Sequence, residues 1–502
     1  MNIDIFNFVD NFMQLRYLAY VAVIALVFFV LFYHLGNPVI FIWDEAIYAN
    51  NALEMAIRHD FWVLWSNNAI TLYNTKPPLV IWLQCLSIWL IGANEWAIRL
   101  PSAIASLLTC FSMFVFAKRV LQNELAGLFG VVSLILTYGF VGEHVARSGD
   151  LDAVLVSAIT FYGLWSFFYL LKQPSNNKTH LSIIGLGILA AFFAKSVAGF
   201  MPLLGLFIGA ILTQKIKQIV KQPYLYVVAI SVIGLCMSYY LYREHLAAGY
   251  LAKVIFSEYR RFGENIMPWH EHPYNYYWTV MTTYKHFNYF VWLLPVALFL
   301  GFATKQYRSF TLLNIAFCAS YLFLISYPSV KLGWYDAPLY PFLCLSIGLG
   351  WSIIVSQLSV LLKKQTLSMA IVLPIFIGFC YLPAKQIIAT INETKRNEVL
   401  EQDAYFIRHL KNNRPNLKQY TVLMPVIRPE HIDVANFYCR SYNYYNGFKL
   451  TLITDTNLVA KNDTILYCLA EAKNYLARNF TAVVLDSLDN CQLVVLKNTK
   501  SK

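Results

Sequence analysis

The sequence carries little charge: Asp, Glu, Lys and Arg make up only 13% of its 502 residues, whereas 58% are hydrophobic and 16% aromatic. Soluble domains carry roughly a quarter charged residues, so this composition excludes a soluble globular protein. Apolar runs of about 20 residues, long enough to cross a bilayer, recur along the chain. We therefore predict a polytopic helical membrane protein.

Signatures of several other classes are missing. The net charge is +12, but the basic residues concentrate in short loops between apolar runs, as the positive-inside rule requires, and no RNA-binding motif accompanies them. We predict no nucleic-acid partner. No CxxC pair indicates zinc or redox chemistry, and no nucleotide-sugar fingerprint is present. The first apolar run, 18–36, lacks a cleavage site, so we interpret it as a retained span.

Most of the nine cysteines lie in or beside apolar segments, where cysteine behaves as a small hydrophobic residue. Cys439, Cys468 and Cys491 fall instead in the polar C-terminal region. One pair of these could form a disulfide if that region is extracytoplasmic. The sequence does not choose the pair.

Basic loops set the predicted topology. If all five are cytoplasmic, the chain crosses consistently only when the run 79–93 does not span. That run is short, follows Pro77 and Pro78, and suits a re-entrant or interfacial helix. We predict about 11 to 13 transmembrane helices, eleven in this arrangement, with the N-terminus inside. The basic loops are 117–124, 171–180, 213–222, 304–308 and 362–366.

The chain divides into two predicted domains. Residues 1–383 form the all-α transmembrane domain, whose first outside loop, 37–99, carries juxtamembrane helices. Residues 384–502 are polar, and apolar runs of strand type alternate there with helical stretches such as 395–411. This pattern predicts a small α/β domain, which the topology places outside.

The same topology gathers the ionisable residues that adjoin apolar stretches onto the outside face. A charge there is costly and normally has a partner or a function. Because acidic and basic side chains occur together there, we predict a site that binds an anionic ligand and that also transfers a proton. The principal residues are Asp44, Glu45, Lys76, Arg147, Asp152, Lys195, Arg260 and Arg261.

Two adjacent carboxylates begin an amphipathic helix within 43–62, which suits the membrane surface. Asp44 is placed to cap this helix, with Glu45 favourable at its positive end. An oriented carboxylate is also a good general base, so the capping and catalytic interpretations are compatible.

Lys76 precedes two prolines that favour the first turn of a helix and hold the lysine in an extended conformation. A fixed ammonium beside a helix N-terminus favours a phosphate. The alternative is a lysine that merely snorkels to the interface.

The segment 142–156 places five ionisable groups at the lip of a span. The alternative to a functional site there is an interfacial salt-bridge cluster with Asp150 as a helix cap. Lys195 stands alone between two apolar runs, where an unpaired lysine is expensive. We therefore expect a carboxylate partner, such as Asp152.

Two further motifs lie on the outside face. Arg260 and Arg261 could clasp a phosphate bidentately, or they could be rim charges of an aromatic interface belt. Tyr335 begins a helix that contains Pro338 and Pro341, and structural and functional interpretations of it are equally open.

The order of these motifs resembles the integral-membrane glycosyltransferases of the GT-C type, above all the superfamily of the aminoarabinose lipid A transferases and the protein O-mannosyltransferases. The resemblance covers about residues 15–385. It rests on "DEAIYANNALEM", "HDFW", "YNTKPPL", "NEWAIRLPSA", "ARSGDLD", "AKSVAG" and "YPFL". Members of this family move a sugar from a polyprenyl-phosphate carrier to an acceptor outside the cytoplasm.

The resemblance implies roles for single residues. Asp44 matches the catalytic carboxylate, which would deprotonate the acceptor in one inverting displacement, and Lys76 matches the lysine that holds the carrier phosphate. The other matched residues are Asp152 as a second catalytic or cavity carboxylate, Lys195 in the cavity, Arg260 or Arg261 and Tyr335 at the phosphate, and Glu45 and Arg147 as supporting residues.

The chain departs from the family pattern where some members bind a metal. Thr75 stands where an acidic residue often precedes the lysine, and the loop "SEYRRF" lacks the usual histidine, the next being His270. We therefore predict no bound metal and no other cofactor, a divalent metal being the open alternative.

The resemblance also implies a place and partners. We expect a bacterial inner-membrane protein with its active site and C-terminal domain on the extracytoplasmic face. The expected donor is a polyprenyl-phosphate sugar, and the acceptor is a lipid, such as lipid A, a glycan or a protein. Two alternatives remain: a transporter or flippase of a lipid-linked sugar, for which internal repeats are expected, and a polysaccharide ligase or polymerase.

Overall fold

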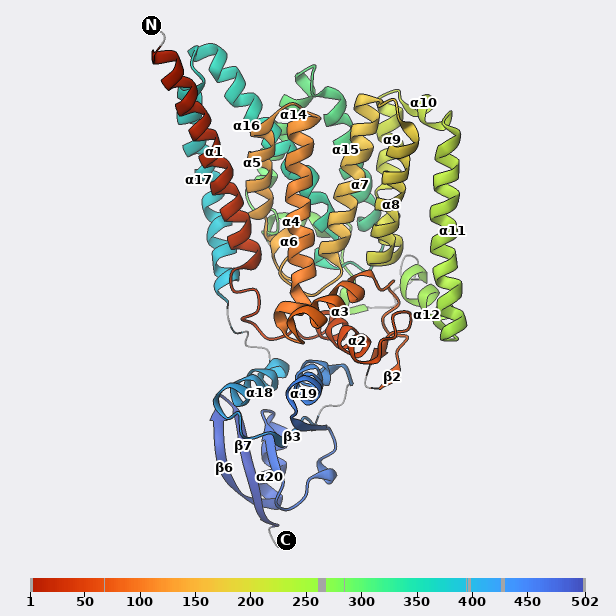
Figure 1. Cartoon of the computed structure of the whole chain (residues 1–502), viewed down its shortest axis with the longest axis vertical. Coiled ribbons are helices and arrows are strands. Elements are labelled where there is room, and N and C mark those ends of the chain that lie inside the picture. The colour runs from red at the N-terminus through yellow and green to blue at the C-terminus, as the bar shows by residue number, and fades with distance from the viewer. Residues whose placement is uncertain are drawn as a thin grey trace.

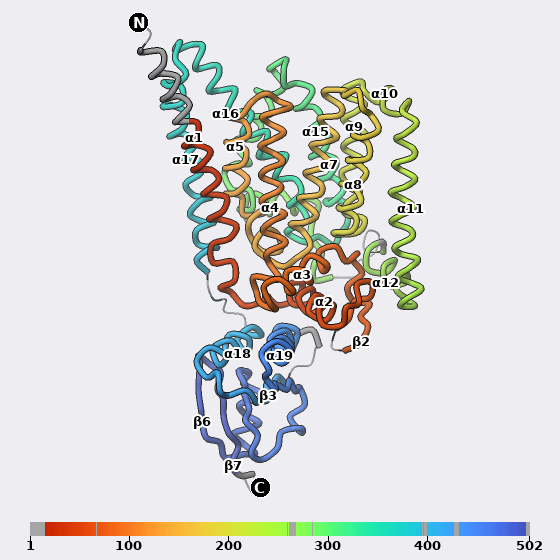
Figure 2. The backbone as a smooth tube through the Cα atoms, viewed as in Figure 1, coloured from red at the N-terminus to blue at the C-terminus, as the bar shows by residue number. Residues whose placement is uncertain are grey.

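The computed structural model describes residues 3–66, 68–260, 268–283, 285–393, 395, 399–425 and 429–499. An upright bundle of helices stands on a layer of short helices, and a small α/β unit lies beyond that layer (Figure 1). The two chain ends lie at opposite extremes of the molecule, as the trace in Figure 2 shows. The architecture is the polytopic membrane domain with a C-terminal α/β unit that the sequence predicts.

Seven helical segments among the described residues are long and apolar enough to cross a membrane. Together with four shorter apolar helices they make up the upright bundle, so the chain is an integral membrane protein. The long helices are α4 (Glu95–Arg119), α7 (Asp152–Lys172), α8 (Asn177–Lys195), α11 (Pro223–Leu246), α15 (Arg308–Ser326), α16 (Tyr340–Leu362) and α17 (Gln365–Asn392); the shorter apolar segments are Arg16–Phe32 of α1 (Ile3–Phe32), α5 (Glu124–Ile135), α9 (Leu203–Leu212) and α14 (Phe290–Ala303).

Helix α3 (Leu79–Ile91) does not join the upright bundle. It lies with α2 (Asp44–Arg58) and α12 (Tyr250–Val254) in the layer of short helices (Figure 1). Its place in this layer, outside the upright bundle, agrees with the prediction that this run does not span.

The remaining elements of the membrane domain are short connectors. A two-stranded antiparallel ribbon, β1 with β2, follows α2, and η2 is a π-helical turn that continues α12. They are β1 (Trp65–Ser66), β2 (Ala69–Ile70), α6 (Tyr138–Val141), α10 (Ile216–Val220), α13 (Tyr276–Thr282), η1 (Ser196–Phe200), η2 (Ile255–Tyr259), η4 (Pro268–His270) and η5 (Gly333–Leu339).

Small residues let the central helices approach closely. At Gly348 in α16, an added Cβ would lie 2.2 Å from the carbonyl oxygen of Ala126 and 2.5 Å from the amide nitrogen of Gly130, both in α5. Membrane helices associate through such close backbone contacts, because lipid offers no hydrophobic driving force between them. The α5–α16 contact therefore fixes the centre of the bundle.

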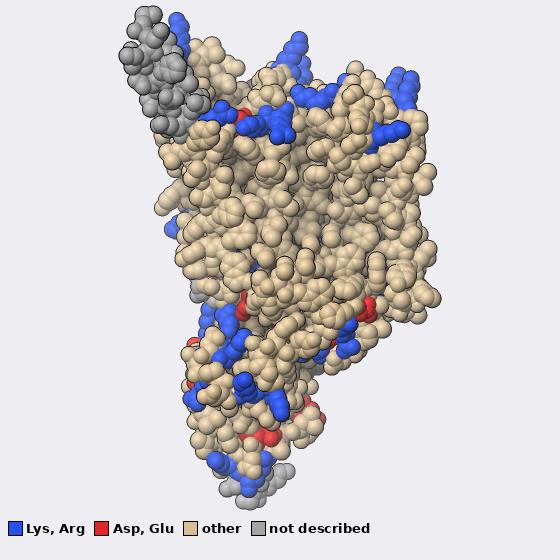
Figure 3. All heavy atoms as spheres, in the orientation of Figure 1, with Lys and Arg blue, Asp and Glu red and all other residues tan. Residues whose placement is uncertain are grey.

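Charge is distributed unevenly along the bundle. In Figure 3, Lys and Arg gather at the end near the N-terminus, a broad uncharged band follows, and charges of both signs reappear towards the α/β unit. The uncharged band is the surface expected to face lipid. We call the end with the five basic loops the basic end, and the end with α2, α3 and α12 the site end.

The C-terminal unit is a five-stranded sheet with helices. The strand order is β4-β3-β5-β7-β6; β3 is parallel to both β4 and β5, and β7 is antiparallel to β5 and β6. Its strands are β3 (Gln419–Leu423), β4 (Lys449–Ile453), β5 (Thr464–Tyr467), β6 (Phe480–Leu488) and β7 (Cys491–Thr499), and its helices and turns are η6 (Val399–Glu401), α18 (Gln402–Asn413), η7 (Pro429–Ile432), α19 (Asp433–Asn446), η8 (Thr456–Leu458) and α20 (Ala470–Asn479).

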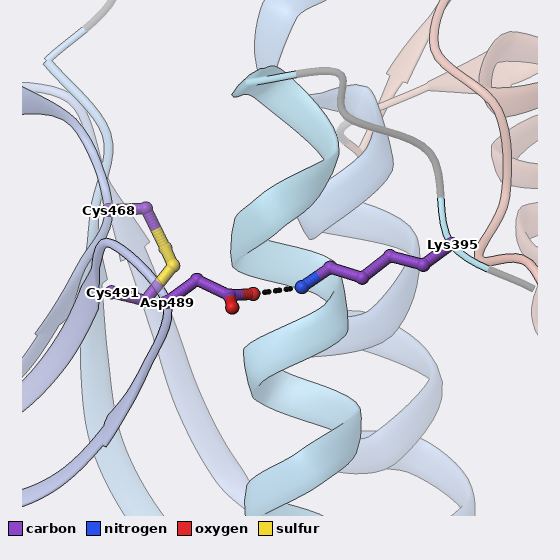
Figure 4. The surroundings of a disulfide bond; sticks show 4 residues. All are labelled: Lys395, Cys468, Asp489 and Cys491. Atoms are coloured by element: carbon purple, nitrogen blue, oxygen red, sulfur yellow. Dashed lines mark hydrogen bonds and ion pairs between the residues drawn. A yellow bond between two sulfur atoms is a disulfide. The ribbon is translucent and has the colours of Figure 1, made fainter.

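A disulfide joins Cys468, just after β5, to Cys491, at the start of the neighbouring β7. Figure 4 shows this bond beside an ion pair between Lys395 and Asp489, which ties the sheet to the segment that follows α17. Cys439 is a buried free thiol. The structure thus selects one of the pairs that the sequence leaves open.

Helix α19 holds the α/β unit against α2 and the start of α4. The Asn50 side-chain amide donates to the carbonyl of Asp433 over 2.8 Å, and Asn436 donates to the Asn50 side-chain oxygen over 3.0 Å. The Tyr438 hydroxyl donates to Glu95 over 2.7 Å. These are buried hydrogen bonds, so the unit is fixed on α2 and on the start of α4.

Candidate active site

Asp44 lies in the first turn of α2, not at its cap. The residue before the helix is Trp43, whose φ is 74°, and it makes no side-chain cap hydrogen bond. The prediction that Asp44 caps the helix is wrong, because the chain enters the helix one residue earlier than the acidic pattern suggests. The Asp44 carboxylate is therefore not committed to the helix end.

Glu45 makes the structural contacts at this point. Arg99 donates to both of its carboxylate oxygens, over 2.7 and 2.8 Å, and the amide of Gly149 donates to it over 2.6 Å. Both charged side chains are only 1% exposed. Arg99 also donates to the carbonyls of Pro38 and Val39. Glu45 thus joins three segments and fixes the backbone beside Asp44.

The surroundings of Asp44 favour a carboxyl group that exchanges its proton near neutrality. Burial raises its pKa, Asp150 raises it further, and the positive charges of His144 and Lys195 oppose the rise, leaving it at about 6. A general base works best when its pKa lies close to the working pH. The carboxylate is thus suited to accept a proton at neutral pH.

His144 pairs with Asp150 next to Asp44. Its Nδ1 lies 2.8 Å from a carboxylate oxygen of Asp150, and its ring stacks on Trp334 with the centroids 3.6 Å apart. Burial opposes protonation of this imidazole, but the neighbouring carboxylates, Asp150 above all, outweigh burial and raise its pKa to about 9. At neutral pH the ring is a fixed positive charge.

Lys195 and Asp152 form the pair that the sequence predicts. The ammonium lies 2.6 Å from both carboxylate oxygens, and it also lies over the ring of Tyr335, 4.9 Å from its centroid. The two side chains come from the last residue of α8 and the first of α7, where the two helices reach the site end.

Lys76 faces the same cavity as this pair. Its backbone amide donates to the Asn74 side chain over 3.1 Å, and its ammonium lies 3.1 Å from Glu258 of η2. The cavity opens to the surface and is small, with a volume of about 60 Å³. Its polar lining is Lys76, Asp152, Lys195, Glu258, Tyr321 and Tyr335.

Arg147 and Arg260 are not brought to this cavity. Arg260 is exposed and lies over the ring of Phe256, 5.3 Å from its centroid, and it is not among the described residues that line the cavity. Arg261 lies outside the described residues. Arg147 donates to the carbonyls of Val30 and Tyr33 over 2.6 and 2.8 Å, so it fastens the end of α1.

Three groups at the site could hold a metal ion. One ligand atom each of Asp44, His144 and Asp150 lies within 4.8 Å of the others, and carboxylate and imidazole are suitable ligands for several divalent metals. Binding requires a neutral imidazole, whereas the raised pKa of His144 favours its protonated form. The absence of a bound metal stays a prediction.

The motifs assign no role to two buried arginines. Arg99 in α4 and Arg243 in α11 are both 0% exposed. Each adjoins an apolar stretch, where a charge is costly, and this is the sequence signal that marks such residues. Glu258 belongs to the charges that the topology places outside, but the sequence does not indicate which lysine it meets.

Comparison with known sequences adds independent evidence. The family model for dolichyl-phosphate-mannose-protein mannosyltransferases matches residues 75–242. An undecaprenyl phosphate-alpha-4-amino-4-deoxy-L-arabinose arabinosyl transferase of Shewanella sediminis is 29% identical over 36% of this chain and 32% of its own length; one of Proteus mirabilis is 25% identical over 38% and 34%. The matches thus span about a third of these relatives.

Solved structures share the fold over nearly the whole chain. The crystal structure of ArnT from Cupriavidus metallidurans bound to undecaprenyl phosphate aligns over 96% of this chain and 98% of its own, with a TM-score of 0.68 and 14% identity. An archaeal oligosaccharyltransferase, AglB from Archaeoglobus fulgidus, aligns over 95% and 74%, with a TM-score of 0.54 and 9% identity. Sequence and fold together confirm the resemblance to the GT-C superfamily of aminoarabinose lipid A transferases and protein O-mannosyltransferases.

Proposed function

We propose that the chain is a glycosyltransferase that moves a sugar from a polyprenyl-phosphate carrier to an acceptor. One observation carries the proposal: the carboxylate of Asp44, with a pKa of about 6, lies within electrostatic reach of Lys195 and Asp152, which line a cavity together with Lys76. The named relatives are arabinosyl transferases that use an undecaprenyl phosphate-linked sugar, which supports a transfer of this class.

The chemistry assigns each group a task. The acceptor oxygen forms a bond to the anomeric carbon while the bond from that carbon to the phosphate oxygen breaks. Asp44 takes the acceptor proton, and the leaving polyprenyl phosphate keeps the electron pair. The growing negative charge on that phosphate is stabilised by Lys76, while Asp152 holds Lys195 at the cavity wall. A single displacement of this kind inverts the anomeric centre.

The distribution of charge supports an extracytoplasmic site. Basic loops lie at the end of the bundle opposite the cavity (Figure 3), and such loops stay in the cytoplasm. The disulfide in the α/β unit agrees, because disulfides persist in oxidising compartments. Since the named relatives are bacterial, we place the protein in a bacterial inner membrane, with its acceptor on the outer side.

We further propose that no metal takes part. The His144 imidazolium and the two cavity lysines already supply positive charge around the carboxylates. Transfer should therefore persist in excess chelator. Loss of transfer with the chelator, restored by one divalent metal, would instead assign a cation to the group of Asp44, His144 and Asp150.

The test is to incubate the purified chain with radiolabelled polyprenyl-phosphate sugars and a membrane extract, and to identify the labelled product. We expect label on a lipid, glycan or protein acceptor. Lys76→Ala should weaken binding of polyprenyl phosphate, whereas Lys118→Ala, at the basic end, should not. Movement of labelled carrier across vesicles without a glycosylated product would favour a flippase.

A further inference from the structure

Arg243 is a buried charge that has no anionic partner among the described residues. It lies in the last turn of α11, none of its three guanidinium nitrogens makes a hydrogen bond of good geometry within the part of the chain that the structure describes, and its neighbouring polar group is the neutral hydroxyl of Tyr239. Its contact is the ring of Tyr250, 4.7 Å from the guanidinium carbon to the ring centroid. A guanidinium removed from water normally pairs with an anion, so the site is built for one.

Glu258 is the nearby anion, and it is only half satisfied. The side chain is 2% exposed. One of its oxygens, Oε1, accepts from Thr75 over 2.9 Å and lies 3.1 Å from the Lys76 ammonium. The other oxygen, Oε2, is buried without a hydrogen bond among the described residues.

The two unsatisfied groups belong to one cluster. The Tyr250 ring that lies under Arg243 donates its hydroxyl to the carbonyl of Thr75 over 2.8 Å, and Thr75 in turn donates to Glu258. The charges of Arg243 and Glu258 both act on the hydroxyl of Tyr239. Glu258 therefore has a present partner, Lys76, and an unused one, Arg243.

We propose that Glu258 is a two-position switch, which holds Lys76 in the carrier-free site and turns to Arg243 when a phosphate takes Lys76. The inference rests on the proposed function, because the phosphate is that of the carrier. A phosphate on Lys76 would otherwise meet the Glu258 carboxylate, and two anions sharing one ammonium repel each other. A turn to Arg243 removes that repulsion and forms a charge-assisted pair with a free guanidinium.

The backbone at Glu258 is suited to such a movement. Ile255–Tyr259 form a π-helical turn, a rare geometry that is enriched at functional sites. Lys76 precedes α3 and Arg243 lies in α11, so an exchange of partners would carry the Glu258 side chain from one element to another. Glu258 thus acts as a positioning residue for Lys76, and it acts before any bond is made.

The test measures binding of a long-chain polyprenyl phosphate to the purified chain, with the uncharged polyprenol as a blank. Glu258→Gln removes the competing charge, so it should bind the phosphate about tenfold more tightly if Lys76 is free in roughly a tenth of wild-type molecules. Binding that is unchanged or weaker would overturn the switch, since Glu258 would then only support Lys76.

A second variant tests the other position. Arg243→Gln removes the place to which Glu258 turns, so it should weaken binding of the phosphate several-fold, and Arg243→Lys should weaken it less. In the Glu258→Gln background, Arg243→Gln should change binding little, because no carboxylate remains to be moved. Equal effects of Arg243→Gln in both backgrounds would overturn the proposal.

Glu54→Gln is the matched control. Glu54 is also a buried glutamate, paired with Arg58 and Arg440 over 2.8 and 2.7 Å, but it does not line the cavity. Its variant should bind polyprenyl phosphate as the wild type does. Wild-type protein that fails to bind polyprenyl phosphate would refute the proposed function itself, whereas wild-type binding without tightening in Glu258→Gln refutes the switch alone.

Discussion

The two ends of the helical bundle use charge in opposite ways. At the basic end, Lys118 pairs with Glu124 over 2.8 Å although its side chain is 42% exposed. At the site end, Glu45 and Arg99 pair at 1% exposure, and Lys195 is held by Asp152. Exposed pairs contribute little to stability, whereas breaking a buried pair leaves an uncompensated charge. Charge at one end sets orientation in the membrane, and at the other end it sets geometry.

The largest expected effect is on the chemistry at the site end. Asp44→Asn should lower the transfer rate by about 10²- to 10⁴-fold, the usual contribution of a general base. The variant should fold and bind polyprenyl phosphate, because Glu45 makes the structural contacts. Transfer assays and thermal unfolding of the same preparation check this, and near wild-type turnover would remove Asp44 from the mechanism.

Breaking the buried pair of Glu45 and Arg99 should lower the stability of the fold. Arg99→Met leaves the Glu45 carboxylate buried without its guanidinium, so we expect a loss of about 3–5 kcal/mol in the free energy of unfolding. Denaturation in detergent measures the change. A loss as small as that of an exposed pair would show that the contrast between the two ends is unfounded.

The disulfide extends the comparison to the α/β unit. Cys468→Ser with Cys491→Ser opens a loop with a sequence separation of 23 residues, which should cost about 3 kcal/mol in the chain-entropy account. Limited proteolysis of the unit, with and without reductant, checks this. Wild-type protein that is equally sensitive under both conditions would contradict it.

Low pH should protonate the Asp44 carboxylate and lower the transfer rate while the protein stays folded. Because the pKa of Asp44 is raised to about 6, its carboxylate is mostly ionised at pH 7 and mostly protonated at pH 5, so transfer should fall about tenfold between them. A pH profile of the rate at saturating donor measures this; a rate that is constant down to pH 4 would contradict it. The groups that face Asp44 and shape this value are Tyr48, His144, Asp150, Asp152 and Lys195.

The smallest expected effect lies at the basic end. Lys118→Gln removes one exposed ammonium from the group with Arg16 and Glu124. We expect transfer and thermal stability within experimental error of the wild type, because water and neighbouring charges replace the pair. A clear loss of either would mean that this surface has a role beyond orientation.

At the site end, the sequence predicts those contacts that follow from the energetic cost of a single residue. An isolated lysine at a membrane lip must find an anion, and the pair of Lys195 with Asp152 follows from that rule. The position of α3 outside the bundle follows from counting membrane crossings between the basic loops, since all of these loops can lie on one side only if α3 does not cross. Both predictions need only the local chain and the properties of the bilayer.

The contacts that the sequence leaves open join distant segments. The local sequence around Glu45 does not predict its pairing with Arg99, and that around Lys76 does not predict its pairing with Glu258. Both pairs form only through the packing of the bundle. The wrong cap at Asp44 has a different cause. The capping preferences of side chains predict where a helix can begin. Here the turn at Trp43, with its positive φ, makes α2 begin at Asp44.

The contacts of the α/β unit also bear on how the molecule is made. Asn50 hydrogen-bonds to Asn436, which is 386 residues later in the chain, and the amide of Ile40 donates to the hydroxyl of Tyr438, which is 398 residues later. The segment that carries Asp44 leaves the ribosome early, but its last supports arrive only near the end of synthesis. Domains fold in the order in which they emerge, so we expect the segment of Asp44 to gain its last supporting contacts only when the α/β unit folds.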